Sequence, residues 1–164
     1  MQFKGRFNND KWFQFGRNQG MGYANIPKLV APEISLGGNY AVDFDGRYYS
    51  TTKVYGYVKR EGLPVSYEFL LGLLNSSLFW FFIQNTGYVL RGGYYTFKTN
   101  YVAPFPFPDC SSLPIDLVSA IEGYVKEIQR ITLAGGDAKL IQIEIDKLVC
   151  TLYSVDYDAV FQGH

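Results

Sequence analysis

Histidine and cysteine, on which many catalytic triads and zinc sites depend, are nearly missing from this chain of 164 residues. The one histidine is the last residue, His164, so it supports neither a catalytic triad nor a histidine-based metal site. Cys110 and Cys150 are too far apart in sequence for a zinc knuckle and provide no disulfide framework. We therefore expect a protein of the reducing cytoplasm, with no catalytic and no metal-binding residues in this chain.

Cofactor loops and membrane segments are also missing. The sequence has no Gly-x-x-x-x-Gly-Lys-Ser/Thr loop, and the glycines between Gly16 and Gly22 lack the spacing of a dinucleotide-binding turn. The first residues have no apolar core of a signal peptide. The apolar run 69–83 includes three polar residues and is shorter than the roughly 20 residues that a membrane span needs. We expect no bound cofactor, no signal peptide and no membrane partner.

Aromatic residues are abundant, with 14 tyrosines, 13 phenylalanines and 2 tryptophans. A buried phenol needs a hydrogen-bond partner, so many tyrosines are expected on a surface that contacts another molecule. The net charge is zero, but residues 1–104 carry eleven Lys and Arg against six Asp and Glu, whereas residues 105–164 carry four against nine. This asymmetry favours a polyanionic partner, with further affinity supplied by other parts of a larger protein.

The segment 91–98, RGGYYTFK, joins one guanidinium, two glycines, two tyrosines and an ammonium within eight residues. Glycine allows a sharp turn or a close approach to a ligand, and arginine makes bidentate contacts with phosphate or with a guanine edge. Such a segment after an apolar helix is typical of a ligand-facing loop, and duplex DNA is the expected ligand. The expected DNA-binding residues here are Arg91, Gly92, Gly93, Tyr94 and Lys98.

Two other places complete the expected DNA-binding set. Arg17, Asn18 and Gln19 form a loop after a glycine. Arginine is suited to guanine, and asparagine or glutamine to adenine, although an ordinary polar turn is the alternative. Lys53 lies close to a predicted hairpin and is expected to contact phosphate.

Short β-like segments broken by turns fill the first half of the chain. The pattern predicts strands over 12–15, 28–31, 34–36, 40–44, 53–58 and 97–102. It also predicts a hairpin turn at Asp45-Gly46 leading into residues 47–50. Ser66 is expected to begin one continuous buried helix that runs through Phe82 and is apolar on nearly every side.

Prolines at 104, 106 and 108 exclude both a helix interior and a central strand, and end this first region. Apolar residues then recur at helical spacing before and after Gly135-Gly136, which predicts two antiparallel helices, and Asp156 is expected to cap a short last one. We predict an α+β fold: an irregular, mostly antiparallel sheet with a buried helix, followed by a C-terminal helical hairpin. Residues 1–108 are expected to form the DNA target-recognition region, with 109–164 as a helical tail packing on it in one compact domain.

Two other protein classes stay open. Asp109 after a proline, followed by Asp137 and Lys139, has the order of a metal-dependent nuclease motif, although Asp137 also lies where a helix cap is expected. A carbohydrate-binding module is similarly aromatic and near neutral, but typically all-β. We assign Asp43 and Asp45 to a solvated hairpin end rather than to acid–base catalysis.

Five segments in order resemble the TaqI-like C-terminal specificity domain of adenine-N6 DNA methyltransferases and fused restriction–modification enzymes. They are WFQFGRNQ at 12–19, KLVAPEI at 28–34, the apolar segment 67–82, RGGYYTFK at 91–98 with the proline-rich segment after it, and EIDKLVCTLY at 144–153. Cys150 and Ser154 depart from the tyrosine and glycine common in the last segment, away from the expected DNA-binding surface.

The resemblance implies a non-catalytic domain that grips duplex DNA and reads a short sequence, mainly from the major groove. In this family a separate N-terminal domain binds S-adenosylmethionine, carries an Asn-Pro-Pro-Tyr/Phe motif that this sequence lacks, and flips out the target adenine. The expected partner in the same polypeptide is that catalytic domain. The parent is expected to be an adenine-N6 DNA methyltransferase, with or without a fused, Mg²⁺-dependent endonuclease.

Overall fold

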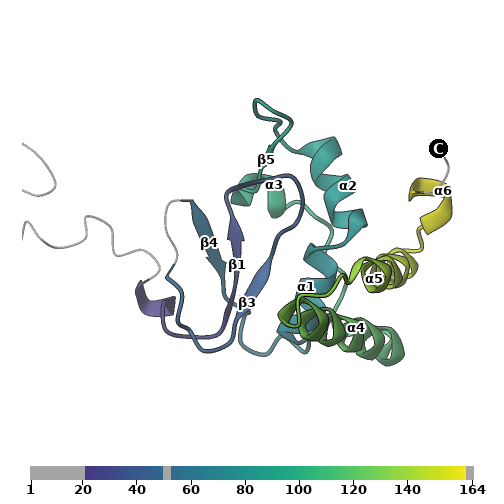
Figure 1. Cartoon of the computed structure of the whole chain (residues 1–164), viewed down its shortest axis with the longest axis horizontal. Helices are drawn as coiled ribbons and strands as arrows, with labels where there is room; N and C mark the ends of the chain where they lie inside the picture. The colour runs from purple at the N-terminus through teal and green to yellow at the C-terminus, as the bar shows by residue number, and fades with distance from the viewer. Residues whose placement is uncertain (1–20, 50–52, 162–164) are drawn as a thin grey trace, which may run out of the picture.

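Two small antiparallel sheets and a set of α-helices form the fold in the computed structural model, which describes residues 21–49 and 53–161 (Figure 1). In the larger sheet β1 (Lys28–Pro32) is the central strand, between β3 (Ala41–Asp43) and β4 (Val54–Tyr57). In the smaller sheet β2 (Ile34–Ser35) pairs with β5 (Tyr95–Thr96). A 3-10 turn, η1 (Met21–Tyr23), precedes β1. The prediction of an α+β fold with an antiparallel sheet is confirmed.

The predicted continuous helix is wrong, because the segment is two helices, α1 (Tyr67–Leu74) and α2 (Ser77–Thr86). Ser66 caps α1 as predicted, by accepting the Phe69 N–H. The break occurs at Asn75 and Ser76, whose side chains bond to backbone groups outside a regular helix ladder. Asn75 bonds both backbone groups of Tyr40, and Ser76 starts α2 by accepting the Phe79 N–H. The second helix is also less buried than predicted, since Phe81 is 44% exposed.

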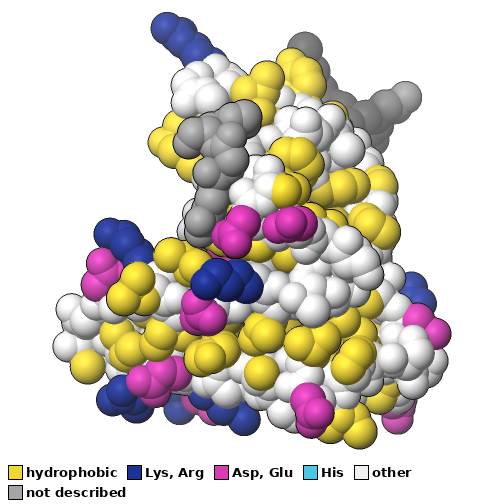
Figure 2. Space-filling model, turned by 90° about the vertical axis from the view of Figure 1, so that its right-hand side faces the viewer, with side chains coloured by type: hydrophobic (Ala, Val, Ile, Leu, Met, Phe, Trp, Pro, Cys, Tyr) yellow, Lys and Arg dark blue, Asp and Glu magenta, His cyan; other side chains and the backbone are white. Residues whose placement is uncertain are grey.

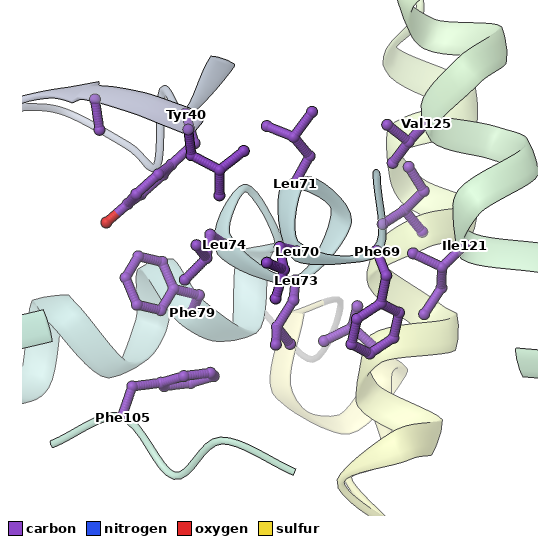
Figure 3. Packing of buried hydrophobic residues seen from close by; sticks show 14 of the residues in the cluster. Tyr40, Phe69, Leu70, Leu71, Leu73, Leu74, Phe79, Phe105, Ile121 and Val125 are labelled. Atoms are coloured by element: carbon purple, nitrogen blue, oxygen red, sulfur yellow. The ribbon is translucent and has the colours of Figure 1, made fainter. Parts of the chain in front are cut away.

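The hydrophobic core surrounds α1, as Figure 3 shows. Phe69 and Leu73 of this helix are fully buried, and Ile121 and Val125 approach it from α4 (Ile115–Leu133). Gly72 permits this approach, because a Cβ atom there would overlap the Ile121 side chain. Fully burying an apolar side chain of this size contributes about 1.5–3 kcal/mol, so the α1–α4 contact is a major source of stability.

The C-terminal helices match the prediction. α4 and α5 (Lys139–Leu152) form an antiparallel pair that packs on α1, and the chain turns between them at Gly135, where φ is +75°. Asp156 caps α6 (Tyr157–Phe161) by accepting the N–H groups of Asp158 and Ala159. Figure 2 shows that the outer face of these helices mixes hydrophobic side chains with charges of both signs. The division of the chain at residue 108 stays a prediction.

Two of the strand predictions are wrong. As far as Tyr49, where the described segment ends, no hairpin forms at Asp45-Gly46, because β3 pairs with β1 and the Asp43 carboxylate accepts the N–H groups of Arg47 and Tyr48, at 3.0 and 2.9 Å. These amides are therefore engaged by a side chain and not by a partner strand. The segment 97–102 is also not a strand, since pairing ends at Phe97 and Thr99–Val102 forms the short helix α3. The predicted strand 12–15 lies outside the described residues.

The α+β architecture differs from the all-β fold that we associated with a carbohydrate-binding module. Through 21–49 and 53–161, each helix lacks either the length or the apolar character needed to cross a bilayer.

Candidate nucleic-acid interface

The segment RGGY lies at the tip of a short hairpin between α2 and β5 that projects from the body of the molecule (Figure 1). The turn is closed by two backbone hydrogen bonds, from Leu90 N–H to Tyr94 O at 2.6 Å and from Gly93 N–H to Leu90 O at 3.2 Å. Gly92 and Gly93 have φ of +87° and +80°, a region that glycine occupies at little cost and other residues rarely adopt. The glycines therefore shape the hairpin tip.

The base of the hairpin is anchored to the core by aromatic packing. The Trp80 ring of α2 meets the Tyr95 ring of β5 edge-on, with centroids 5.2 Å apart, and stacks parallel to buried Phe97 at 6.3 Å. Aromatic pairs of this kind contribute about 0.5–1.5 kcal/mol beyond the area they bury. The hairpin consequently has a fixed base below an exposed tip.

The tip presents polar and aromatic groups to solvent. Arg91 is exposed and Tyr94 is 43% exposed, while Tyr88, at the base of the hairpin opposite Thr96, is 59% exposed. Within the described part of the chain, Arg91 has no ion-pair partner. The guanidinium is thus available to a phosphate or a base edge.

Two of the predicted residues, Lys53 and Lys98, meet at one carboxylate. Lys53 Nζ lies 3.5 Å from Glu33 Oε2, and Lys98 Nζ lies 3.6 Å from Glu33 Oε1. The lysine side chains are 75% and 56% exposed, whereas that of Glu33 is 12% exposed. Because Lys98 lies two residues after the end of β5, this cluster lies at the base of the same hairpin that carries Arg91.

A pocket of about 370 Å³ opens beside this cluster. It is lined by residues of the hairpin, of β2 and of the segment around α3: Glu33, Ile34, Tyr88, Leu90, Thr96, Lys98, Asn100 and Tyr101. The buried hydroxyl of Thr96 has no hydrogen-bond partner among the described residues. The pocket combines aromatic, amide and ammonium groups, which are groups that stack on bases, bond to base edges and bind phosphate.

Asp43 does not lie at a solvated hairpin end, which corrects our prediction. Its side chain is buried and forms an ion pair with buried Lys28, whereas Asp45 is exposed and pairs with Arg47 at 2.9 Å. Burial opposes ionisation of Asp43, but hydrogen bonds from Lys28, Tyr48 and Arg47 outweigh it and lower its pKa to about 2. This carboxylate organises the loop after β3.

The residues of the nuclease-like motif are held by their own neighbours. Asp109 accepts hydrogen bonds from the N–H and hydroxyl of Ser111, at 3.0 and 2.7 Å, and these bonds lower its pKa. Asp137 accepts the N–H of Lys139 at 3.0 Å, and that bond lowers the pKa of Asp137. In the described ranges, no group of three or more His, Cys, Asp or Glu side chains is arranged to hold a metal ion.

The structure thus brings together the predicted site residues from 53 onward, whereas those at 17–19 are not among the described residues. Arg91, Gly92, Gly93 and Tyr94 share the hairpin tip, with Lys98 and Lys53 at its base. The predicted loop of Arg17, Asn18 and Gln19 lies outside the described residues. The structure also places Glu33, Tyr88 and Asn100 beside these residues, and the sequence analysis did not single them out. For Glu33 the sequence does hold a signal: acidic residues are rare in this region, with only six among the first 104 residues.

Comparison with known protein families gives a match. The model of the TaqI-like C-terminal specificity domain matches residues 3–107, which is more than half of the chain and includes β1, the hairpin and the proline-rich segment. The similar segment 144–153 lies beyond the matched residues. A search among curated proteins found no match. Together with the resemblance of its sequence segments, the match establishes that this chain belongs to the TaqI-like C-terminal specificity domain family.

Proposed function

We propose that this domain binds double-stranded DNA and reads a short sequence on behalf of an adenine-specific DNA methyltransferase or a combined restriction–modification enzyme. The observation that carries the proposal is the projecting hairpin, with Arg91 and Tyr94 at its tip and Lys53 and Lys98 at its base. The family to which the chain belongs, the TaqI-like C-terminal specificity domains, supports the same role.

The hairpin suits a groove of the duplex. The major groove admits a two-stranded β-ribbon, and the glycines at 92 and 93 keep the tip narrow. Arg91 would then reach the phosphate backbone or a base edge, while Lys53 and Lys98 would neutralise phosphates beside the hairpin. Specific bases would be read by residues 17–19.

The division of labour in the parent protein follows from this proposal. The chain supplies recognition, and a catalytic domain in the same polypeptide supplies methyl transfer with S-adenosylmethionine. Mg²⁺ belongs to an endonuclease domain where the parent has one. A DNA-modifying protein of this kind works in the cytoplasm, where its substrate lies.

The test is a binding titration of the chain against a randomised duplex pool at low and at moderate salt. Enrichment of one short motif would establish a self-sufficient sequence reader. Salt-sensitive binding without enrichment would mean that DNA binding resides here and that specificity needs the catalytic domain. Absence of binding even at low salt would contradict the proposed function.

A further inference from the structure

Glu33, which is mostly buried, contacts two lysines that are mostly exposed. The carboxylate is 12% exposed and lies between two ammonium groups that are 75% and 56% exposed. Each carboxylate oxygen faces a different lysine, at 3.5 Å for Lys53 and 3.6 Å for Lys98. One negative charge is therefore shared by two positive charges that extend into solvent.

The backbone holds this arrangement in place. Glu33 lies between β1 and β2, and its N–H donates to Lys53 O at 2.8 Å. Its own carbonyl accepts the N–H of Phe97 at 2.7 Å. The residue thus connects the segment before β4 to the segment after β5, and brings together two lysines that are 45 positions apart in sequence.

The two ion pairs are loose enough for a phosphate to compete with them. Charge-assisted hydrogen bonds between nitrogen and oxygen are typically about 2.7–2.9 Å long, and both contacts here are longer. The lysine side chains are flexible and largely exposed, so their ammonium groups can turn to an incoming phosphate. Glu33 is largely buried and cannot follow them, so it stays behind as a nearby negative charge.

From this geometry we infer that Lys53 and Lys98 form one DNA-phosphate site in which Glu33 is a built-in competitor for the two ammonium groups. The inference rests on the proposed function and adds a positioning residue that weakens binding to any duplex, whatever its sequence. Phosphate contacts supply nearly all sequence-independent affinity for DNA. Restraining them keeps the domain from being held at non-target sites, while contacts with bases are unaffected.

Glu33→Gln tests this inference, because it removes the negative charge and keeps the size of the side chain. We expect this variant to bind a random-sequence duplex roughly two- to thirtyfold more tightly at low salt, the combined range for releasing two weak ion pairs. The slope of log affinity against log salt should steepen by up to about 0.9, the contribution of one additional phosphate contact. Adding Lys98→Met should remove much of both gains.

Glu127→Gln is the matched control. Glu127 also pairs with a cation, Arg130, at 2.6 Å, but it lies on α4, away from the hairpin in Figure 1. This variant changes the net charge by the same amount and should leave the affinity and the salt slope near those of the original chain. Glu33→Asp keeps the charge but withdraws it by one methylene, so its affinity should lie between those of the original chain and Glu33→Gln, with thermal unfolding confirming that every variant is folded.

The outcomes separate this inference from the proposed function. If the original chain binds DNA and Glu33→Gln behaves like Glu127→Gln, the competitor role of Glu33 is wrong while DNA binding stands. Weaker binding by Glu33→Gln would overturn the inference as well, since the carboxylate would then be holding the lysines in a productive position. If the original chain fails to bind any duplex at low salt, the proposed function itself fails, and this inference with it.

Discussion

Lys28 and Asp43 face each other across β1 and β3, with Lys28 Nζ 2.7 Å from Asp43 Oδ2 and both side chains only 2% exposed. Lys28 also donates to Ala24 O at 2.8 Å, and Asp43 accepts two backbone N–H groups of the following loop. A buried charge is tolerated only when it is paired and hydrogen-bonded, and this pair meets both conditions. It therefore connects the segment before β1 to the loop after β3.

The first prediction concerns pH. Because the folded-state pKa of Asp43 is lowered to about 2, below the ordinary value of about 3.9, its ionised form stabilises the fold above pH 4, and this stabilisation is lost as the pH falls towards 2. Asp43→Asn should lower the melting temperature at neutral pH and flatten its dependence on pH in this window. Thermal unfolding between pH 2 and 7 measures both effects. The exposed Asp45→Asn serves as the control, and an equal effect of the two substitutions would contradict the role of Asp43.

The second prediction concerns the break between α1 and α2. Ser76 is buried, accepts the Phe79 N–H and donates to Leu73 O, so Ser76→Ala leaves the Phe79 N–H at the start of α2 without its partner. Loss of such a cap costs about 0.5–2 kcal/mol in the free energy of unfolding. Chemical denaturation measures this cost. Ser119→Ala, an exposed position inside α4, should change stability by less than about 0.5 kcal/mol, so similar costs at the two sites would argue against the cap.

The third prediction compares two helical glycines. Gly72 of α1 faces Ile121 and Val125, so Gly72→Ala forces the helices apart and should destabilise the domain by about 1–3 kcal/mol. A Cβ at Gly123 of α4 meets nothing within 4 Å, so Gly123→Ala should stabilise by about 0.5–1 kcal/mol through its higher helix propensity. Opposite signs in denaturant midpoints are expected, and a stabilising Gly72→Ala would show that the α1–α4 contact is looser than the structure shows.

The fourth prediction concerns DNA. Arg91→Ala should weaken binding by a similar factor for all duplex sequences and reduce the salt slope by about 0.9, because an exposed guanidinium at a hairpin tip is suited to phosphate. Gln19→Ala should instead relax the preference for the target sequence, with a smaller change in salt slope. Parallel titrations with a target and a random duplex distinguish the two. A sequence-selective loss for Arg91→Ala would reassign this residue to reading bases.

Some predictions held because their signals are local. The β-like segments 28–31 and 53–58, the capping serine at 66 and the apolar spacing of α4 and α5 all appear in the described structure. Each depends on interactions between residues only a few positions apart. The continuous helix failed for the opposite reason, because Asn75 turns to Tyr40, which lies 35 positions earlier in the chain.

The sequence by itself determined the family, the α+β class, the caps at Ser66 and Asp156 and the exposed loop around Gly92 and Gly93. Only the tertiary structure decided that β1 takes β3 and β4 as partners, that Asp43 is buried against Lys28, and that Lys53 and Lys98 converge on Glu33. The physical reason is the separation in sequence between the residues that interact. Caps, turns and periodic patterns act within a turn or two of backbone, whereas strand partners and charge clusters depend on which distant segments bury their apolar faces together.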